Sequence, residues 1–287
     1  MTRIVYVNGT FVPEDQASVS VFDRGFLMAD GVYEVTSVLN SKLIDFAGHL
    51  ARLDRSLSEL EIPNPHDPAT WLAIHRDLIA RNAMTEGLVY LQVTRGAPED
   101  RDFVWPNPAT CPPTVVLFTQ TKTALADNPD AKRGWSVIFV EDLRWGRRDI
   151  KTVQLLYPSL AKMMAKKAGA DDAWLVKDGF VTEGTSNNAY IVKGNTIVTR
   201  PLSNDILHGI TRSAVLRLSR ERQMEVVERP FSIAEAQGAD EAFVTSASSF
   251  VMPVIKLDGV TLGDGKPGPV ARRVRAIYID EMNKSAT

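Results

Sequence analysis

The sequence predicts two α+β domains, of which the second is the larger. The chain has 287 residues, a length that favours more than one hydrophobic core. Patterns typical of strands and of helices are mixed along it, without the regular alternation that indicates a doubly wound sheet. A polar stretch without apolar periodicity, "TKTALADNPDAKRG", interrupts them. We therefore expect a small domain over residues 1–120, a linker over 121–134 and a large domain over 135–287.

Alternating apolar residues and turn residues predict the strands of the small domain. "RIVYV" and "TFVP" flank Asn8-Gly9, a dipeptide typical of a tight β-hairpin. "GVYEVTSVLNSKLIDF" predicts a second pair of strands that turns at Asn40-Ser41, and "LVYLQVT" and "PTVVLFT" predict two more strands.

Two helices are expected between these strands. Within residues 46–61, leucines recur at helical spacing and form one apolar stripe: Leu50, Leu53, Leu57 and Leu60. Pro63 ends this helix. Asp67 is a typical cap for a second helix, which has Pro68 at its first position.

The large domain is expected to mix strands and helices. Apolar runs predict strands over residues 135–143, 148–156, 171–184, 189–199 and 241–246. Helical patterns occur near residues 159–169, 211–223, 232–237 and 269–283.

Composition and motif searches exclude several classes of function. The net charge is −2, and no basic run is interleaved with aromatic residues, so nucleic acid is not an expected partner. The single cysteine, Cys111, excludes an internal disulfide and fits a reducing compartment. No apolar run approaches the length of a membrane span and the N-terminal residues lack a signal-peptide core, so we expect a cytoplasmic protein. Four scattered histidines offer no metal site, and P-loop and nucleophile-elbow spacings are absent.

Three features indicate a different chemistry. Lys151 lies in the apolar run "RDIKTVQLL", where burial favours a neutral amine able to form a Schiff base; the alternative is a lysine on the outward face of a half-buried strand. Glu183 ends an apolar strand and is able to neutralise a cationic ring nitrogen, or else is a solvated loop acid. Gly209 precedes a helix that Thr211 can cap, which predicts an anion site or an ordinary capped helix.

Six stretches in order resemble the fold-type IV pyridoxal-phosphate enzymes, the class IV aminotransferase family. They are "DRGFLMADGVYEV", "HLARL", "RRDIKTVQLL", "VTEGTSNN", "LHGITR" and "FVTSASS". The resemblance runs from Tyr6 to about Tyr278 and is strongest to the D-amino-acid aminotransferases. It implies a smaller N-terminal α/β domain, a larger C-terminal domain with a mixed, barrel-like sheet, and a homodimer.

The resemblance also implies the cofactor, pyridoxal 5'-phosphate, and its ligands. Lys151 holds it covalently as a Schiff base and moves the substrate proton, while Glu183 faces the pyridine nitrogen and keeps the ring an electron sink. Arg52, which lies off the leucine stripe of its helix, binds the phosphate. The remaining implied contacts are Leu207 against the ring and Ile210, Thr211, Ser246 and Ala247 around the phosphate.

The implied reaction is ping-pong transamination between D-amino acids such as D-alanine and 2-oxo acids. Tyr33 matches the tyrosine that binds the substrate carboxylate in D-amino-acid aminotransferases. The Arg-x-His pair of those enzymes is absent from "TRGAPEDRDFVWP", where Arg101 is the candidate carboxylate ligand. The alternative is that Arg101 pairs with a neighbouring loop acid.

Three other activities share the cofactor motifs and remain open. They are transamination of (R)-amines, transamination of branched-chain L-amino acids, and an aminodeoxychorismate lyase reaction, and they differ from the first mainly in the substrate pocket.

Overall fold

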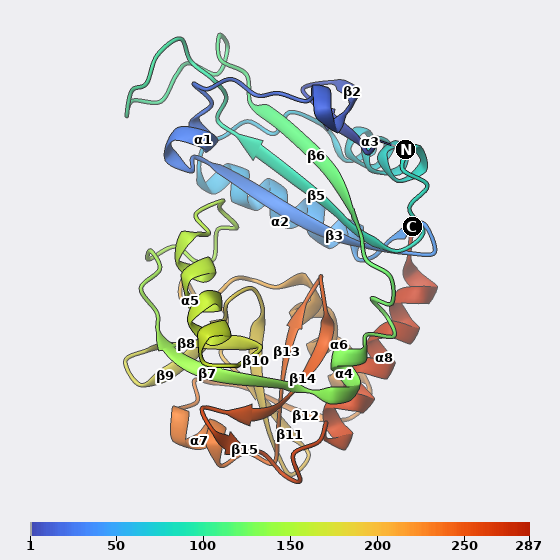
Figure 1. Cartoon of the computed structure of the whole chain (residues 1–287), viewed down its shortest axis with the longest axis vertical. Coiled ribbons are helices and arrows are strands. Elements are labelled where there is room, and N and C mark those ends of the chain that lie inside the picture. The colour runs from blue at the N-terminus through green and yellow to red at the C-terminus, as the bar shows by residue number, and fades with distance from the viewer. Residues whose placement is uncertain (1) are drawn as a thin grey trace. The chain divides into compact units, whose positions relative to one another are not determined.

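The computed structural model describes residues 2–287, which form two compact units (Figure 1). The first contains the residues up to Leu125, together with Ile150–Gln154 and Ser285–Thr287. The second contains Ala126–Asp149 and Leu155–Lys284. Lys151 thus packs in the first unit, although its sequence position falls in the range expected for the large domain.

A six-stranded antiparallel sheet forms the first unit, in the order β2-β1-β6-β5-β3-β4. The strands are β1 (Ile4–Val7), β2 (Thr10–Pro13), β3 (Gly31–Leu39), β4 (Lys42–Leu43), β5 (Gly87–Thr94) and β6 (Thr114–Thr121). Its helices are α1 (Arg24–Met28), α2 (Phe46–Glu59) and α3 (Pro68–Arg81), with a single 3-10 turn at Glu14–Gln16.

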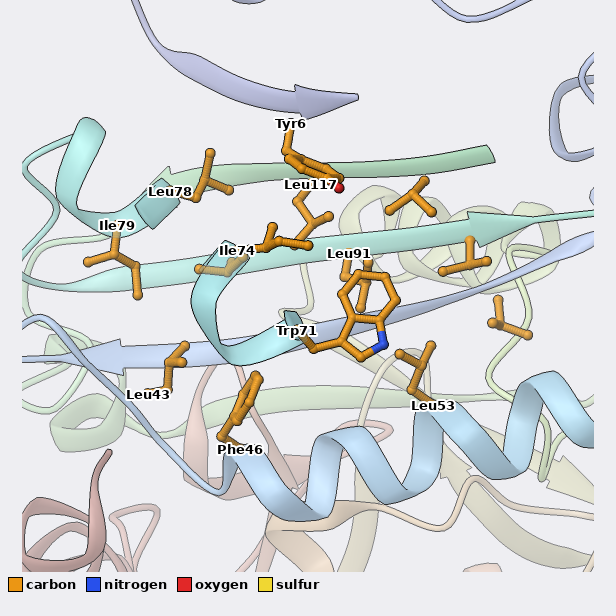
Figure 2. Packing of buried hydrophobic residues seen from close by; sticks show 14 of the residues in the cluster. Tyr6, Leu43, Phe46, Leu53, Trp71, Ile74, Leu78, Ile79, Leu91 and Leu117 are labelled. Atoms are coloured by element: carbon orange, nitrogen blue, oxygen red, sulfur yellow. The ribbon is translucent and has the colours of Figure 1, made fainter. Parts of the chain in front are cut away.

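The core of this unit lies between the sheet and the two long helices (Figure 2). Leu53 on α2 and Trp71 on α3 are almost completely buried against strand residues such as Leu91. The predicted hairpin at Asn8-Gly9 and both predicted helices are confirmed. Asp67 caps α3, since its carboxylate accepts a hydrogen bond of 2.8 Å from the Thr70 amide.

A mixed, curled sheet forms the second unit, in the order β12-β11-β10-β13-β14-β7-β8-β9, with β15 beside β14 (Figure 1). β9 also lies close to β10, so the sheet is a half-barrel, which confirms the predicted fold class. Its strands are β7 (Trp135–Glu141), β8 (Asp172–Lys177), β9 (Phe180–Gly184), β10 (Asn188–Lys193), β11 (Thr196–Thr199), β12 (Glu225–Glu228), β13 (Glu241–Ser246), β14 (Phe250–Leu257) and β15 (Val260–Thr261).

Five helices complete the second unit: α4 (Pro129–Arg133), α5 (Leu156–Lys167), α6 (Ile210–Glu221), α7 (Ile233–Gln237) and α8 (Pro269–Ser285), whose last residue is grouped with the first unit. In the part of the chain that the structure describes, no helix is both long and apolar enough to cross a membrane. β12, β14, β15, α1 and α4 were not predicted.

The strand predicted over residues 148–156 is wrong. Residues 150–154 are irregular and make one isolated bridge, between Thr152 and Val32. The Tyr33 amide donates to the Lys151 carbonyl at 3.0 Å, and the Val153 amide donates to the Gly31 carbonyl at 3.1 Å. This short segment therefore hydrogen-bonds to the backbone of the first residues of β3. The apolar residues that follow it begin helix α5 instead of continuing a strand.

Candidate active site

Lys151 lies half-buried beside the start of β3 in the first unit. Its Nζ is 4.1 Å from the centroid of the Tyr33 ring, a distance at which an ammonium is attracted to the ring face. Among residues 2–287, no carboxylate pairs with this amine and no side chain hydrogen-bonds to it. Lys151 is therefore half-buried with its amine next to an aromatic face, rather than fully buried as expected.

Tyr33 belongs to a row of aromatic rings that crosses three strands. Its ring stacks on Tyr90 of β5 with centroids 5.6 Å apart, and Tyr90 stacks on Phe118 of β6 at 4.7 Å. Because side chains alternate along a strand, these rings lie on the face opposite the one that carries Leu91 and the helices. The row fixes the ring plane that Lys151 faces.

Arg52 is buried on α2 and paired with Glu34, a residue that sequence reasoning missed. Its Nε donates to Glu34 Oε1 at 2.7 Å and a terminal nitrogen donates to Oε2 at 2.8 Å, while His49 Nδ1 lies 2.8 Å from Oε2. Burial alone raises the pKa of Glu34, but the Arg52 charge outweighs it and holds that pKa well below its usual range. Glu34 therefore already binds two nitrogens of Arg52, and the predicted role of Arg52 at the phosphate stays a prediction.

Glu183 lies near the end of strand β9 in the second unit, as expected, one residue before the last, and it is almost fully buried. Its Oε1 accepts a hydrogen bond of 2.5 Å from Arg144, and its Oε2 accepts bonds from Asn188 Nδ2 at 3.0 Å and from the Leu207 amide at 3.1 Å. Burial raises the pKa of Glu183, and Arg144 opposes that rise only in part. The solvated-loop alternative is excluded.

Arg144 divides its charge between two acids, and this explains its partial effect. Its Nε and one terminal nitrogen bind Asp142 at 2.9 and 2.8 Å, and the other terminal nitrogen binds Glu183. Thr182 Oγ1 donates to Asp142 at 2.7 Å and secures the far end of this hydrogen-bonded row. Glu183 and Asp142 thus share the Arg144 guanidinium, and Arg148 lies 3.5 Å from Asp142 as a second cation on that acid.

The segment before α6 is built around Asn188. Its Nδ2 also donates to the Leu207 carbonyl at 3.0 Å, so Leu207 is held beside Glu183 by both of its backbone groups. A Cβ at Gly209 would lie 2.1 Å from Asn188 Oδ1, so no larger residue fits there without moving Asn188. This is why glycine precedes the helix.

Helix α6 begins differently from the prediction. Gly209 is its N-cap, with no side-chain capping bond, and Thr211 is its buried second residue, so the expected Thr211 cap is wrong. The first amides of an α-helix have no partner within the helix, and here the first of them belong to Ile210 and Thr211. Such amides suit an anion.

Ser246 ends β13, at the same end of the sheet as Asn188, since Asn188 pairs with Thr245. Ser246 Oγ bonds to Ser249 Oγ at 2.7 Å. The second unit therefore brings five of its expected cofactor residues, from Leu207 to Ala247, to the region around Asn188 and α6, which packs on β13.

Arg101 lies on the exposed loop between β5 and β6. Its guanidinium is 5.0 Å from the Phe103 ring centroid, and its backbone amide donates to Asp100 at 2.7 Å. No carboxylate pairs with its side chain within the described part of the chain, so the expected alternative of an ion pair with a loop acid does not occur.

The chain belongs to the class IV aminotransferases. The family model described as "Amino-transferase class IV" matches residues 31–257, most of the chain. This confirms the family prediction and makes the protein an aminotransferase.

Particular relatives are consistent with this assignment. The chain is 38% identical over 272 residues to D-alanine aminotransferase of Bacillus licheniformis, with 94% of each chain covered. Identity to D-alanine aminotransferase of Staphylococcus haemolyticus is 37% over 276 residues, with 96% of each covered. The solved structure of a branched-chain amino acid aminotransferase from T.th. with pyridoxamine 5'-phosphate superposes with a TM-score of 0.90 at 26% identity, covering 100% of this chain and 98% of that one.

Proposed function

We propose that this aminotransferase exchanges amino groups between D-amino acids and 2-oxo acids, with pyridoxal 5'-phosphate as cofactor. The observation that best supports this cofactor is the buried Glu183 carboxylate, which accepts hydrogen bonds from Arg144 and from the Leu207 amide. The first amides of α6, in the same unit as Glu183, suit a phosphate, and the half-buried amine of Lys151 is the proposed partner of the cofactor aldehyde. The similarity to D-alanine aminotransferases supports the substrate class.

Each residue has a distinct proposed task. The bound cofactor supplies an electron sink that stabilises negative charge at the substrate α-carbon. Lys151 Nζ would hold the cofactor, and the same amine would accept the substrate α-proton as general base and later return it. Glu183 keeps a proton on the ring nitrogen, and its raised pKa suits a proton shared between the two.

Phosphate binding is proposed for the α6 amides of Ile210 and Thr211, with Ser246, the Ala247 amide and Arg52. For Arg52 the proposal concerns its charge and its fixed position, because Glu34 already binds two of its nitrogens. Leu207 is the proposed ring contact.

Recognition of the substrate carboxylate is proposed for Tyr33 and Arg101. A guanidinium suits a carboxylate because it donates two parallel hydrogen bonds, and Arg101 has no competing acid within residues 2–287.

A donor panel tests the proposal. The purified protein, saturated with pyridoxal 5'-phosphate and 2-oxoglutarate, should form pyruvate from D-alanine and none from L-alanine. Lys151→Ala should lose both this activity and the visible Schiff-base absorbance. Faster turnover of L-leucine or of (R)-1-phenylethylamine than of D-alanine would instead establish one of the alternative substrate classes.

We also propose a cytoplasmic homodimer. A buried free thiol at Cys111 supports a reducing compartment. Four exposed apolar side chains on α5, Leu156, Leu160, Met163 and Met164, lie on one face of the helix and support an interface.

A further inference from the structure

The loop of residues 95–113, between β5 and β6, is held by little apolar packing of its own. Phe103 and Val104 at its tip are 76% and 73% exposed. A cavity of about 190 Å³ lies at its base, lined by Glu61, Pro63, Arg95, Trp105, Pro106 and Pro108. Apolar contacts alone therefore do not explain how the loop keeps one conformation.

Arg24 ties the loop by its backbone. Its side chain is only 4% exposed, and one terminal nitrogen donates to the Asp102 carbonyl at 2.5 Å and reaches the Val104 carbonyl at 3.4 Å. The other terminal nitrogen lies 3.5 Å from the Phe103 carbonyl. One buried guanidinium thus holds three consecutive carbonyls of the residues that directly follow Arg101.

Asp30 fixes Arg24 and couples it to a second arginine. Asp30 Oδ2 accepts from Arg24 Nε at 2.7 Å and from Arg95 Nε at 2.8 Å. The Arg95 guanidinium lies 3.9 Å from the centroid of the Trp105 ring. A single carboxylate therefore orients both arginines that hold the loop from Asp102 to Trp105.

The turn that carries Arg24 is also joined to the start of the loop. The Arg24 amide donates to the Gly96 carbonyl at 2.9 Å, and the Arg95 amide donates to the Asp30 carbonyl at 3.1 Å. Thr94 Oγ1 donates to Asp23 Oδ2 at 2.7 Å. Residues 23–30 therefore form a platform that binds the chain on both sides of Arg101: at residues 94–96, where the loop starts, and at residues 102–104.

We propose that Arg24 and Asp30 are positioning residues for recognition of the substrate carboxylate. They hold the backbone at Asp102 to Val104, and thereby place the Cα of the adjacent Arg101, whose guanidinium has no acidic partner in residues 2–287. This inference rests on the proposed role of Arg101.

Arg24→Lys tests the positioning role without removing the charge. A lysine still pairs with Asp30, but one ammonium cannot bind Asp30 and three carbonyls together, because the fork of five donors is lost. In the holoenzyme, KM for D-alanine should rise about tenfold while kcat changes by less than about twofold. Arg3→Lys is the matched control, since Arg3 also binds a backbone carbonyl, that of Thr119, elsewhere on the same sheet; its KM should equal that of the wild type.

A double-mutant cycle with Arg101→Ala separates positioning from general weakening. If Arg24 acts through Arg101, Arg24→Lys should add almost nothing to the KM of the Arg101→Ala protein. An equal rise in KM in both backgrounds would overturn the proposal. A raised KM for Arg101→Ala beside an unchanged KM for Arg24→Lys would overturn the positioning role alone, whereas an unchanged KM for Arg101→Ala would overturn the assigned role of Arg101 itself.

Hydrogen exchange gives a readout independent of turnover. Peptides that cover residues 99–106 should exchange about tenfold faster in Arg24→Lys than in the wild type and the Arg3→Lys control. Unchanged exchange in these peptides would show that Arg24 does not hold the loop.

Discussion

Two buried glutamates have pKa values shifted in opposite directions by their surroundings. Glu34 has a whole guanidinium and His49 beside it, so its pKa is lowered and it stays ionised as a fixed partner of Arg52. Glu183 shares its arginine with Asp142, so burial prevails and its pKa is raised. The first acid orients a cation permanently, and the second retains affinity for a proton.

The burial of His75 should lower the free energy of unfolding in acid. It is fully buried, and burial lowers its pKa to about 4, below the 6.5 of an unfolded histidine. The unfolded chain therefore binds a proton between pH 6.5 and 4 that the folded chain does not, so stability falls as the pH falls through this window, by on the order of 3 kcal/mol. Urea unfolding at several pH values measures this slope.

His75→Gln should flatten that slope, because glutamine can still donate to the Trp71 carbonyl that His75 Nδ1 contacts at 2.7 Å. His66→Gln is the control, since His66 is only partly buried and should change the slope less. An unchanged slope in the His75 variant would assign the acid loss to other groups.

Gly209→Ala should weaken cofactor binding about tenfold. The new Cβ displaces Asn188, whose amide holds both Glu183 and the Leu207 carbonyl. Titration of the apoenzyme with pyridoxal 5'-phosphate measures the effect. At Gly146 a Cβ meets nothing within 4 Å, so Gly146→Ala is a control that should bind normally. Equal affinities in the two variants would contradict the role of Asn188.

The sequence indicated Glu183 and Arg52 as candidate site residues but not the side chains that bind them, Arg144 and Glu34. Arg144 lies 39 residues before Glu183, a separation that no local pattern reveals. Glu34 is two residues after the inward-facing Val32 and so lies on the same face of its strand, where a buried acid needs a partner; this spacing is the one sequence feature that indicates its role.

Helices and hairpins were predictable where local chemistry decides them, as at the Asp67 cap and the Asn8-Gly9 turn. Two elements were not. "RDIKTVQLL" has strand composition, but the free edge of β3 takes only a short part of it, and the rest turns into α5. β14 contains Pro253, and a proline argues against a central strand because it has no backbone N–H to donate. The strand forms nonetheless, since its pairing with β7 begins only after the proline, at Val254.

The apolar face of α5 predicts an assembly defect. Leu160→Asp places a charge among Leu156, Met163 and Met164 and should weaken the dimer at least tenfold, as measured by size exclusion with light scattering at several concentrations. Lys166→Asp, on another face of the same helix, is the control and should leave the mass unchanged. A stable dimer in the Leu160 variant would show that this face is not the interface.

The two units are not consecutive pieces of the chain, and this predicts how a fragment behaves. Residues 1–125 alone lack Ile150, which is 3% exposed in the core of the first unit, and lack the segment that pairs with the edge of β3. They also lack Thr287, whose amide and carbonyl both bond to Leu43. The fragment should show no cooperative thermal transition by circular dichroism, whereas the full chain should; a sharp transition in the fragment would contradict this.

The polar stretch near Pro129 marked a division of the chain, but its sequence could not reveal that five residues around Lys151 join the first unit. That assignment depends on an unpaired strand edge, which exists only after the sheet has formed.

The platform of residues 23–30 binds the loop through backbone carbonyl oxygens, which every amino acid has. The side chains at positions 101, 103 and 104 are therefore interchangeable as far as the shape of the loop is concerned. A lineage can exchange one substrate for another at these positions without rebuilding the scaffold beneath them. Libraries that seek new donors should randomise these three positions and leave Arg24 and Asp30 untouched.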